Sequence, residues 1–303
     1  MRYWGCVLLI GLLVACSSSP PPSDVIHLSE LHPLPVRLVS DVVPLRVSVA
    51  AVVSPQGTLE SYQPLLDYLS HQLDRPVELV QRQTYTETNT LIEENAVDIA
   101  FVCTSAYIEG HDRFGMELLA APQVNGAASY QSLLIVPASS SADNMADLAG
   151  LVFAFTDPIS FSGRVYPTYL VQQLGSTPED FFARTFFTYN HDNAIRAVAN
   201  GIADGAAVDS LVYDFAVQRD PALATQVRVI HRSPAFGIPP VVINPNARPQ
   251  LKAMLQELLL NMAVDPEGQA ALAMLGVEEF VLLDDDTYDS ARAIIQTVET
   301  VSP

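Results

Sequence analysis

Two serines and a glycine follow directly after an apolar run near the middle of the chain. The run Phe153–Phe155 leads through 156–158 (TDP) to Ser160, Ser162 and Gly163, and a helical pattern follows. Hydroxyl groups placed there can cap the helix by accepting hydrogen bonds from the free N–H groups of its first turn. The same N–H groups, with the hydroxyls and the positive end of the helix dipole, can instead bind an anion. The stretch by itself therefore predicts either a helix cap or an anion site.

The composition limits which partners such a site can serve. The chain has 303 residues, 49% of them hydrophobic, and 15 Lys and Arg stand against 34 Asp and Glu, for a net charge of −19. A surface of this sign repels nucleic acids and anionic membranes, so neither is an expected partner. An anion site in this chain must rely on backbone amides, hydroxyls and helix dipoles, because basic residues are scarce.

The N-terminus has the pattern of a bacterial lipoprotein signal. Arg2 precedes an apolar run, Val7–Val14, that is too short to span a bilayer. Ala15 and Cys16 follow, and then a run of serines and prolines. We interpret residues 1–16 as a signal peptide that ends at a lipidated Cys16, with a plain secretory signal as the alternative. Acyl chains on this residue would anchor the chain to a membrane.

The cysteines support this interpretation. Cys6 lies in the signal peptide and Cys16 is the predicted lipidation site, which leaves Cys103 alone in the folded part. One cysteine forms no internal disulfide, and the sequence shows no metal-ligand spacing, so we expect no metal and no cofactor. Cys103 ends an apolar strand pattern and is interpreted as a core residue.

The remaining sequence alternates strand and helix patterns. Residues 17–44 are rich in Ser and Pro and predict a tether. After it, apolar strands alternate with helices of 3.6-residue period, which predicts an α/β fold with parallel strands. We expect two lobes, the first formed by residues 45–136 and 241–303 and the second by residues 137–240. Two chain crossings would then form a hinge with a cleft between the lobes.

Several stretches in this order resemble one protein family. They are 97–101 (VDIAF), 129–132 (SYQS), 156–163 (TDPISFSG), 189–201 (YNHDNAIRAVANG) and 233–240 (SPAFGIPP). Together they resemble the phosphate, phosphite and phosphonate substrate-binding proteins of ABC importers, over residues 45–290. The resemblance implies a two-lobed periplasmic-binding-protein fold, type II-like, that closes on its ligand.

The resemblance also implies the ligand-binding residues. Ser160 and Ser162, with the backbone amides of Phe161 and Gly163, would hold the phosphoryl oxygens. The other implied residues are Tyr85 and Tyr130 in the first lobe and His191 and Asp209 in the second. The tyrosines and the histidine would donate hydrogen bonds, and Asp209 would accept one from a ligand that keeps a proton. A carboxylate there would repel sulfate or a sulfonate.

Each of these residues also has an ordinary structural interpretation. His191 and Asp209 can cap the helices that follow them, and Tyr85 and Tyr130 can be packing residues with one polar end. The turn departs from the common family form at Phe161, where Thr or Asn is usual, so that a side-chain contact is lost and the ring can narrow the pocket. The stretch Phe236–Pro240 lacks the acid that aminophosphonate binders use, which favours phosphate, phosphite or a small alkylphosphonate.

We therefore expect a monomeric, lipid-anchored binding protein on the outer face of the membrane, which delivers a phosphorus oxyanion to the transmembrane subunits of an ABC permease. A ligand-binding subunit that feeds a sensor kinase, or a binder of another small anion such as a sulfonate, are the alternatives. Ser160, His191 and Asp209 have the residue types of a hydrolytic triad. The chain has no nucleophile-elbow, phosphate-loop or zinc motif, so we do not expect an enzyme.

Overall fold

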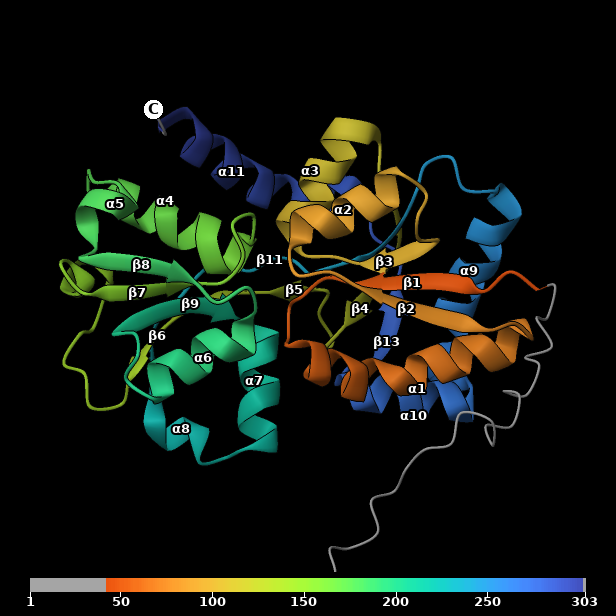
Figure 1. The fold of residues 1–303 in the computed structure, drawn as a ribbon, viewed down its shortest axis with the longest axis horizontal. Coiled ribbons are helices and arrows are strands. Elements are labelled where there is room, and N and C mark those ends of the chain that lie inside the picture. The colour runs from red at the N-terminus through yellow and green to blue at the C-terminus, as the bar shows by residue number, and fades with distance from the viewer. Residues whose placement is uncertain (1–41, 302–303) are drawn as a thin grey trace, which may run out of the picture. The chain divides into compact units, whose positions relative to one another are not determined.

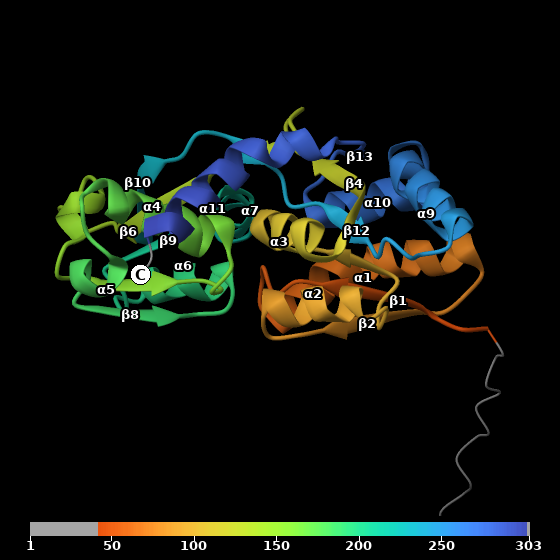
Figure 2. The ribbon, with the colours of Figure 1, turned by 90° about the horizontal axis from the view of Figure 1, so that it is seen from above.

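The computed structural model describes residues 42–301, which form two sheets covered by helices (Figures 1 and 2). The predicted signal peptide, Cys16 and all but the last residues of the tether lie outside the described residues. Among the described residues, no helix is long and apolar enough to cross a membrane. The two sheets define two lobes, and we describe them in turn.

The first lobe surrounds a six-stranded sheet with the strand order β13-β4-β12-β3-β1-β2. Its elements are β1 (Leu45–Val49), α1 (Pro55–Leu73), β2 (Val77–Gln81), α2 (Tyr85–Glu93), β3 (Ile99–Phe101), α3 (Thr104–Phe114), β4 (Glu117–Gln123), β12 (Val241–Ile243), α9 (Pro249–Asn261), α10 (Pro266–Leu275) and β13 (Glu279–Val281). Helices α1, α9 and α10 share one apolar cluster with the sheet, and α2 and α3 share another. The two clusters occupy its opposite faces because alternate strand residues point to opposite sides.

The second lobe surrounds a five-stranded sheet with the strand order β10-β6-β9-β7-β8. Its elements are β6 (Ser132–Pro137), β7 (Val152–Phe155), α4 (Tyr166–Gln173), α5 (Pro178–Phe181), β8 (Arg184–Phe187), α6 (His191–Ala199), β9 (Gly205–Asp209), α7 (Ser210–Arg219), α8 (Leu223–Gln226) and β10 (Val227–Arg232). Leu133 and Ile135 pack toward α6 and α7, whereas Leu134 and Val136 pack toward the opposite face.

The two sheets have equivalent topologies. In each, three parallel strands, β2-β1-β3 or β8-β7-β9, lie beside antiparallel strands, three in the first sheet (β12, β4 and β13) and two in the second (β6 and β10). The first antiparallel strand, β12 or β6, is the one that enters the sheet after the chain has crossed from the other lobe. The crossings themselves pair as a two-stranded ribbon, β5 (Ser129–Tyr130) with β11 (Phe236–Gly237), which Figure 1 shows between the lobes.

The structure places one strand differently from the sequence prediction. We expected the first lobe to continue to residue 136, but β6 pairs with β9 and β10 and so belongs to the second sheet from Ser132 onward. A run of apolar residues shows that a buried strand exists without showing which sheet it joins. Helix α3 and strand β4 were not predicted, because Thr104–Phe114 is polar on average and shows no clear helical period.

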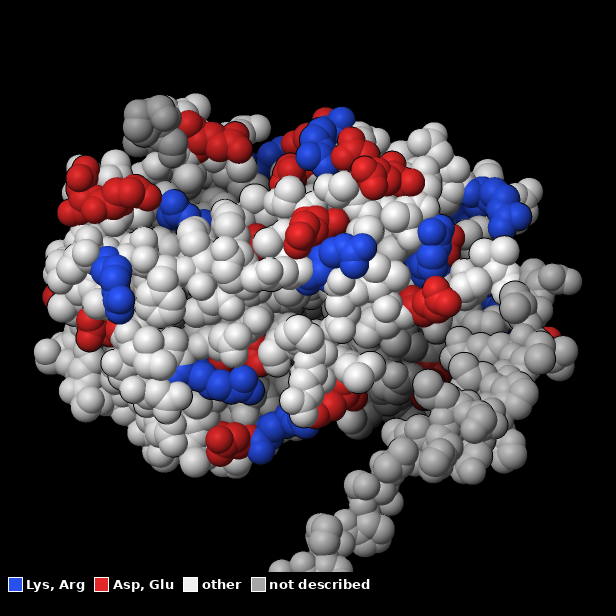
Figure 3. All heavy atoms as spheres, in the orientation of Figure 1, with Lys and Arg blue, Asp and Glu red and all other residues white. Residues whose placement is uncertain are grey.

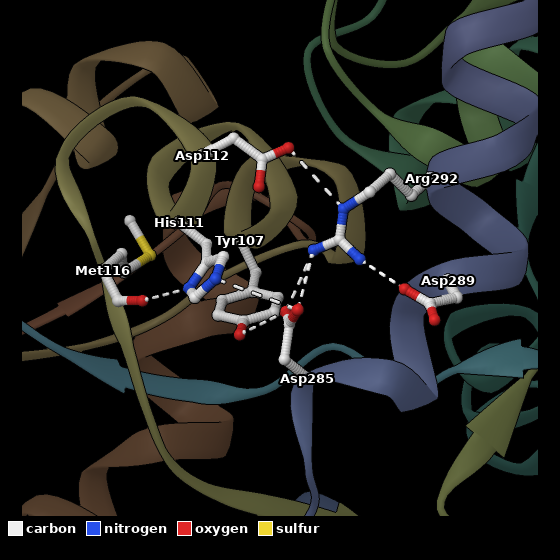
Figure 4. A network of polar contacts seen from close by, with 7 residues as sticks. All are labelled: Tyr107, His111, Asp112, Met116, Asp285, Asp289 and Arg292. Atoms are coloured by element: carbon white, nitrogen blue, oxygen red, sulfur yellow. Dashed lines mark hydrogen bonds and ion pairs between the residues drawn. The ribbon is translucent and has the colours of Figure 1, made fainter.

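The last helix, α11 (Asp289–Val301), packs against α4 and α3 and is therefore shared by both lobes. The expectation that all of 241–303 belongs to the first lobe is thus wrong for this helix. Arg292 holds its first turn, since its guanidinium contacts Asp112 (3.6 Å), Asp285 (2.9 Å) and Asp289 (2.7 Å), as Figure 4 shows. Asp285 also accepts a hydrogen bond from the Tyr107 hydroxyl at 2.8 Å, so this acidic turn is a structural anchor.

Candidate anion site

The turn from Thr156 to Gly163 is held in place by the buried carboxylate of Asp157. Its Oδ1 accepts the Ile159 N–H within the turn at 2.9 Å. Its Oδ2 accepts the N–H of Tyr85, at the start of α2 in the other lobe, at 3.0 Å. Burial raises the pKa of Asp157, and these two amides act against that rise. One carboxylate therefore fixes both the turn and the first residue of α2.

The two serines of the turn have different environments. Ser160 Oγ accepts the Gly163 N–H at 3.2 Å, so this hydroxyl caps the π-helical turn η3 (Phe161–Val165) from which α4 continues. Ser162 Oγ is buried and has no hydrogen-bond partner. The capping interpretation therefore describes Ser160, while Ser162 carries a hydroxyl that the fold itself leaves unpaired.

Gly163 is required for a close approach between two segments. A Cβ atom on this residue would lie 1.8 Å from Thr156 Oγ1 and 2.7 Å from Thr156 Cβ, far inside van der Waals contact. The amide of Gly163, which was expected to contact the ligand, donates to Ser160 Oγ in this structure. Thr156 Oγ1, which lies over the glycine, is also buried and unpaired.

Phe161 points its ring into the core. The ring is fully buried and packs edge-on against Phe236, with 4.7 Å between ring centroids. It belongs to the apolar cluster that also contains Tyr166. The ring therefore replaces a polar side chain of the common turn with packing between the turn and strand β11.

The two predicted tyrosines bring unpaired hydroxyls to the same place. Tyr85 begins α2 and Tyr130 ends β5; both are buried, and neither hydroxyl has a hydrogen-bond partner. The Ser162 and Thr104 side chains lie beside the Tyr130 hydroxyl and act to lower its pKa, against the larger effect of burial. The pKa of each phenol is raised well above its usual value, chiefly by burial, so both remain protonated donors.

His191 and Asp209 complete the cluster from the second lobe. The Asp209 N–H donates to His191 Nδ1 at 3.0 Å, so in the neutral imidazole Nε2 carries the hydrogen and can donate. Burial lowers the pKa of His191 to about 3, which keeps the ring neutral. Asp209 Oδ1 caps α7 through the amides of Leu211 (2.7 Å) and Val212 (3.4 Å). Burial raises the pKa of Asp209 to about 7 despite these two amides.

These residues form one group, which we call the polar cluster: Tyr85, Tyr130, Thr156, Ser162, His191 and Asp209. Asp209 raises the pKa of both tyrosines through its charge. Ser132 stands opposite Asp209 in the sheet and donates to the Ser162 carbonyl at 2.7 Å, which ties β9 to the turn. The structure thus brings the predicted hydroxyls, imidazole and carboxylate together. Thr156, quoted in the family pattern, was not predicted as a separate contact.

The sequence analysis also missed the start of α3. Cys103 is buried as expected, but it borders the polar cluster, since the Tyr85 and Tyr130 phenols and the Asp209 carboxylate all interact with it electrostatically. The Phe161 amide lowers the pKa of its thiol, while burial, the larger effect, raises it. A polar Thr-Ser pair directly after a buried strand, at 104–105, is the signal that could have identified this helix start.

No Lys or Arg belongs to the polar cluster. Arg164, the basic residue of the turn, stacks on Phe155 with its guanidinium carbon 4.4 Å from the ring centroid and bonds to Thr168. Elsewhere basic side chains lie among acidic ones, as Figure 3 shows for one face. Within residues 42–301, no group of three or more His, Cys, Asp and Glu is arranged to hold a metal ion. The cluster therefore offers neutral donors and one titratable carboxylate.

The geometry differs from a catalytic triad. In a Ser-His-Asp triad the aspartate accepts a hydrogen bond from the imidazole, and the imidazole bonds to the serine hydroxyl. Here His191 Nδ1 is the acceptor and the backbone of Asp209 is the donor. Ser160 Oγ is engaged with Gly163. The three residues do not form the relay that their types suggested.

A family model and two known proteins match most of this chain. A family model described as "ABC transporter, phosphonate, periplasmic substrate-binding protein" matches residues 47–288. The "Phosphonates-binding periplasmic protein" of Escherichia coli is 27% identical over 241 residues, which cover 78% of this chain and 71% of that protein. The "Phosphate-import protein PhnD" of Mycolicibacterium smegmatis is 29% identical over 241 residues, 75% of this chain and 70% of that one.

Solved structures have the same fold. A binding-protein component of an ABC phosphonate transporter from Pseudomonas aeruginosa superposes with a TM-score of 0.80 and 26% identity, over 86% of this chain and 87% of that one. PhnD1 of Prochlorococcus marinus, in complex with methylphosphonate, has a TM-score of 0.76 and 18% identity, over 85% of this chain and 98% of that one. The predicted two-lobed α/β fold of type II and the family resemblance are confirmed.

The contrast between the two serines gives a stability prediction. Ser160→Ala removes a helix cap and should lower the free energy of unfolding by about 1 kcal/mol. Ser162→Ala removes a buried hydroxyl without a partner, so it should leave the stability of the ligand-free protein unchanged or raise it by less than about 1 kcal/mol. Urea unfolding of both variants in anion-free buffer measures this. A larger loss for Ser162→Ala than for Ser160→Ala would show that Ser162 is the structural residue.

Proposed function

This chain belongs to the family of periplasmic substrate-binding proteins of phosphonate ABC transporters, and we propose that its polar cluster binds a phosphorus oxyanion: phosphate, phosphite or an organophosphonate. Family membership implies that the chain acts outside the cytoplasm and that its partners are a small ligand and a transporter permease. We further propose that the chain acts as a monomer and binds its ligand without turning it over. The alternatives are a subunit that feeds a sensor kinase and a binder of sulfonates.

One observation carries the proposal. Four buried hydroxyls of the polar cluster, those of Tyr85, Tyr130, Thr156 and Ser162, have no hydrogen-bond partner in the protein. A buried polar group left unpaired costs about 1–3 kcal/mol, so a fold rarely gathers four of them without use. A tetrahedral phosphorus oxyanion presents three oxygens, or four in phosphate, with several lone pairs each, and accepts hydrogen bonds from many directions. Its oxygens would pair these hydroxyls, with His191 Nε2 as a further donor.

Asp209 supplies the selectivity in this proposal. Its Oδ1 is engaged with α7, which leaves Oδ2 to face the ligand. With a pKa near 7 it titrates in the same range as the last proton of phosphate and phosphonates, so ligand and carboxylate would share one proton across a hydrogen bond. Sulfate brings no proton at neutral pH and would meet a carboxylate that must first be protonated.

Binding itself is the first test. We expect Tyr85→Phe, Tyr130→Phe and Ser162→Ala each to weaken binding of methylphosphonate by about 1–3 kcal/mol, the usual loss for a hydrogen bond to a charged group. Calorimetry with phosphate, phosphite and methylphosphonate measures this. Tyr68→Phe is the matched control, because the Tyr68 hydroxyl bonds to the Leu258 carbonyl at 3.4 Å in the distant core. Unchanged affinity in all three cluster variants would refute the proposed site.

The shared proton gives a pH dependence. Above the pKa of Asp209 and the last pKa of the ligand, both groups are ionised, and formation of the complex must take up one proton. The affinity for phosphate and methylphosphonate should therefore fall about tenfold per pH unit above about pH 8. Asp209→Asn should flatten this profile and raise the affinity for sulfate relative to phosphate, since an amide can donate to an unprotonated oxygen. Binding titrations of the native protein and of Asp209→Asn between pH 5.5 and 9 measure both effects. A flat profile in the native protein would remove Asp209 from the site. Equal binding of sulfate and phosphate would remove its role in selectivity and favour a sulfonate ligand.

The proposed lipid anchor rests on the sequence around Cys16, which lies outside the described residues. Cys16→Ser should move the protein from the membrane fraction to the soluble fraction, because each buried CH₂ of an acyl chain contributes about 0.8 kcal/mol to membrane binding. Ligand affinity should stay the same. Fractionation and mass spectrometry of the N-terminal peptide measure the outcome. Continued membrane attachment of a variant without an acyl group would contradict the lipoprotein proposal.

A further inference from the structure

A cavity of about 500 Å³ adjoins the polar cluster at Asp209. Both lobes line it. The first lobe and the crossings contribute residues that follow β1, residues in α1, β3 and β4, and residues around Gly276. The second lobe contributes one side of α7. The apolar residues among them include Val53, Phe101, Val124, Leu211, Phe215 and Phe280.

The cavity and the polar cluster share walls. Asp209 belongs to both. Val52 lines the cavity, and its carbonyl accepts the N–H of His191 at 2.9 Å. Val102 lines the cavity directly before Cys103, which borders the cluster. The cavity therefore begins at Asp209, the one residue of the polar cluster that lines it.

The wall of the cavity is mainly apolar and aromatic. Tyr62 packs edge-on against Phe101, with ring centroids 5.1 Å apart, and Phe101 packs against Phe280 at 6.3 Å. On the other side are Leu211 and Phe215 of α7. Such a wall favours contact with hydrocarbon or an aromatic ring over contact with water.

The charged groups of the wall are the carboxylates of Asp209 and Asp214, and no Lys or Arg lines the cavity among the described residues. A second anionic group on the ligand would be repelled there. A cationic group has little to gain, since Asp209 Oδ1 is engaged with two α7 amides and Arg232 lowers the pKa of Asp214, against the larger effect of burial. The wall thus suits an uncharged substituent.

We propose that this cavity holds the organic group of the ligand, and that the chain is selective for phosphonates with an uncharged alkyl or aryl substituent larger than methyl. The inference rests on the proposed function and deepens it. Phosphate and phosphite have no such group, and methylphosphonate would leave most of the cavity to water. Cavities of about 300–1,000 Å³ with apolar walls and a few polar groups are typical of sites for whole organic molecules.

Calorimetry of the purified protein tests this with phosphate, methylphosphonate, n-propylphosphonate, phenylphosphonate and 2-aminoethylphosphonate. We expect phenylphosphonate to bind at least tenfold more tightly than methylphosphonate, which corresponds to about 1.4 kcal/mol. The comparison of n-propylphosphonate with 2-aminoethylphosphonate isolates charge, because the two have the same number of heavy atoms. The propyl compound should bind more tightly.

Two variants that fill the cavity connect the preference to its wall. Val124→Phe, in the loop after β4, and Val53→Phe, after β1, place a ring in the cavity from positions outside the polar cluster. Each should remove most of the preference for phenylphosphonate and leave methylphosphonate affinity within about twofold. Val264→Phe is the matched control, since this valine is exposed and far from the cavity lining.

The outcomes separate the two proposals. If methylphosphonate and phosphate bind but phenylphosphonate binds equally or less tightly, the cavity is not a substituent site and the proposed function stands. Tighter binding of 2-aminoethylphosphonate than of n-propylphosphonate would overturn the proposed selectivity for an uncharged substituent. If both cavity-filling variants, Val124→Phe and Val53→Phe, still prefer phenylphosphonate, the phenyl ring of the ligand binds outside this cavity. If no phosphorus compound binds the native protein, the proposed function fails and the inference fails with it.

Discussion

The whole site depends on the hydrogen bonds of one buried carboxylate, that of Asp157. Its two oxygens accept an amide of its own turn and the Tyr85 amide at the start of α2, so it fixes the Ser160–Gly163 segment and the Tyr85 phenol relative to one another. Because the two amides come from different lobes, the same carboxylate also joins the lobes. A buried carboxylate is tolerated only when hydrogen bonds compensate its charge, which makes this geometry strict.

The absence of Lys and Arg from the polar cluster determines what the remaining residues must do. A site that pairs an anion with a buried cation gains affinity for any anion of the right size. A site of neutral hydroxyls with one titratable carboxylate distinguishes anions by where their protons are. The hydroxyls of Tyr85, Tyr130 and Ser162 are neutral donors of this kind. Each is unpaired and so lowers the stability of the ligand-free protein, but each offers a hydrogen bond in a defined direction.

The sequence predicted the parts of the site that local chemistry determines. The strand-turn-helix at 153–167 and the family pattern identified Ser162, and the tyrosines followed from that pattern. Capping was one of two open interpretations of Ser160, and the structure shows its Oγ accepting the Gly163 N–H. The partner sheet of β6 and the shared position of α11 depend on long-range pairing, which no local period encodes. The sequence did not show that Cys103 borders the polar cluster, because a buried residue fits the same apolar strand pattern whether it faces the core or the site.

The contacts that join the lobes lie beside the groups proposed to bind the ligand. The Tyr85 N–H donates to Asp157, the Ser105 hydroxyl to the Ile159 carbonyl, and the His191 N–H to the Val52 carbonyl at 2.9 Å. Tyr85 and His191 each bear a proposed ligand donor, and Ser105 lies two residues after Cys103, which borders the polar cluster. A ligand that draws the tyrosine hydroxyls and His191 Nε2 onto its oxygens therefore favours the backbone positions that make the interlobe bonds. The β5–β11 ribbon joins the lobes, and a ligand that binds groups of both lobes would favour the arrangement in which these bonds form.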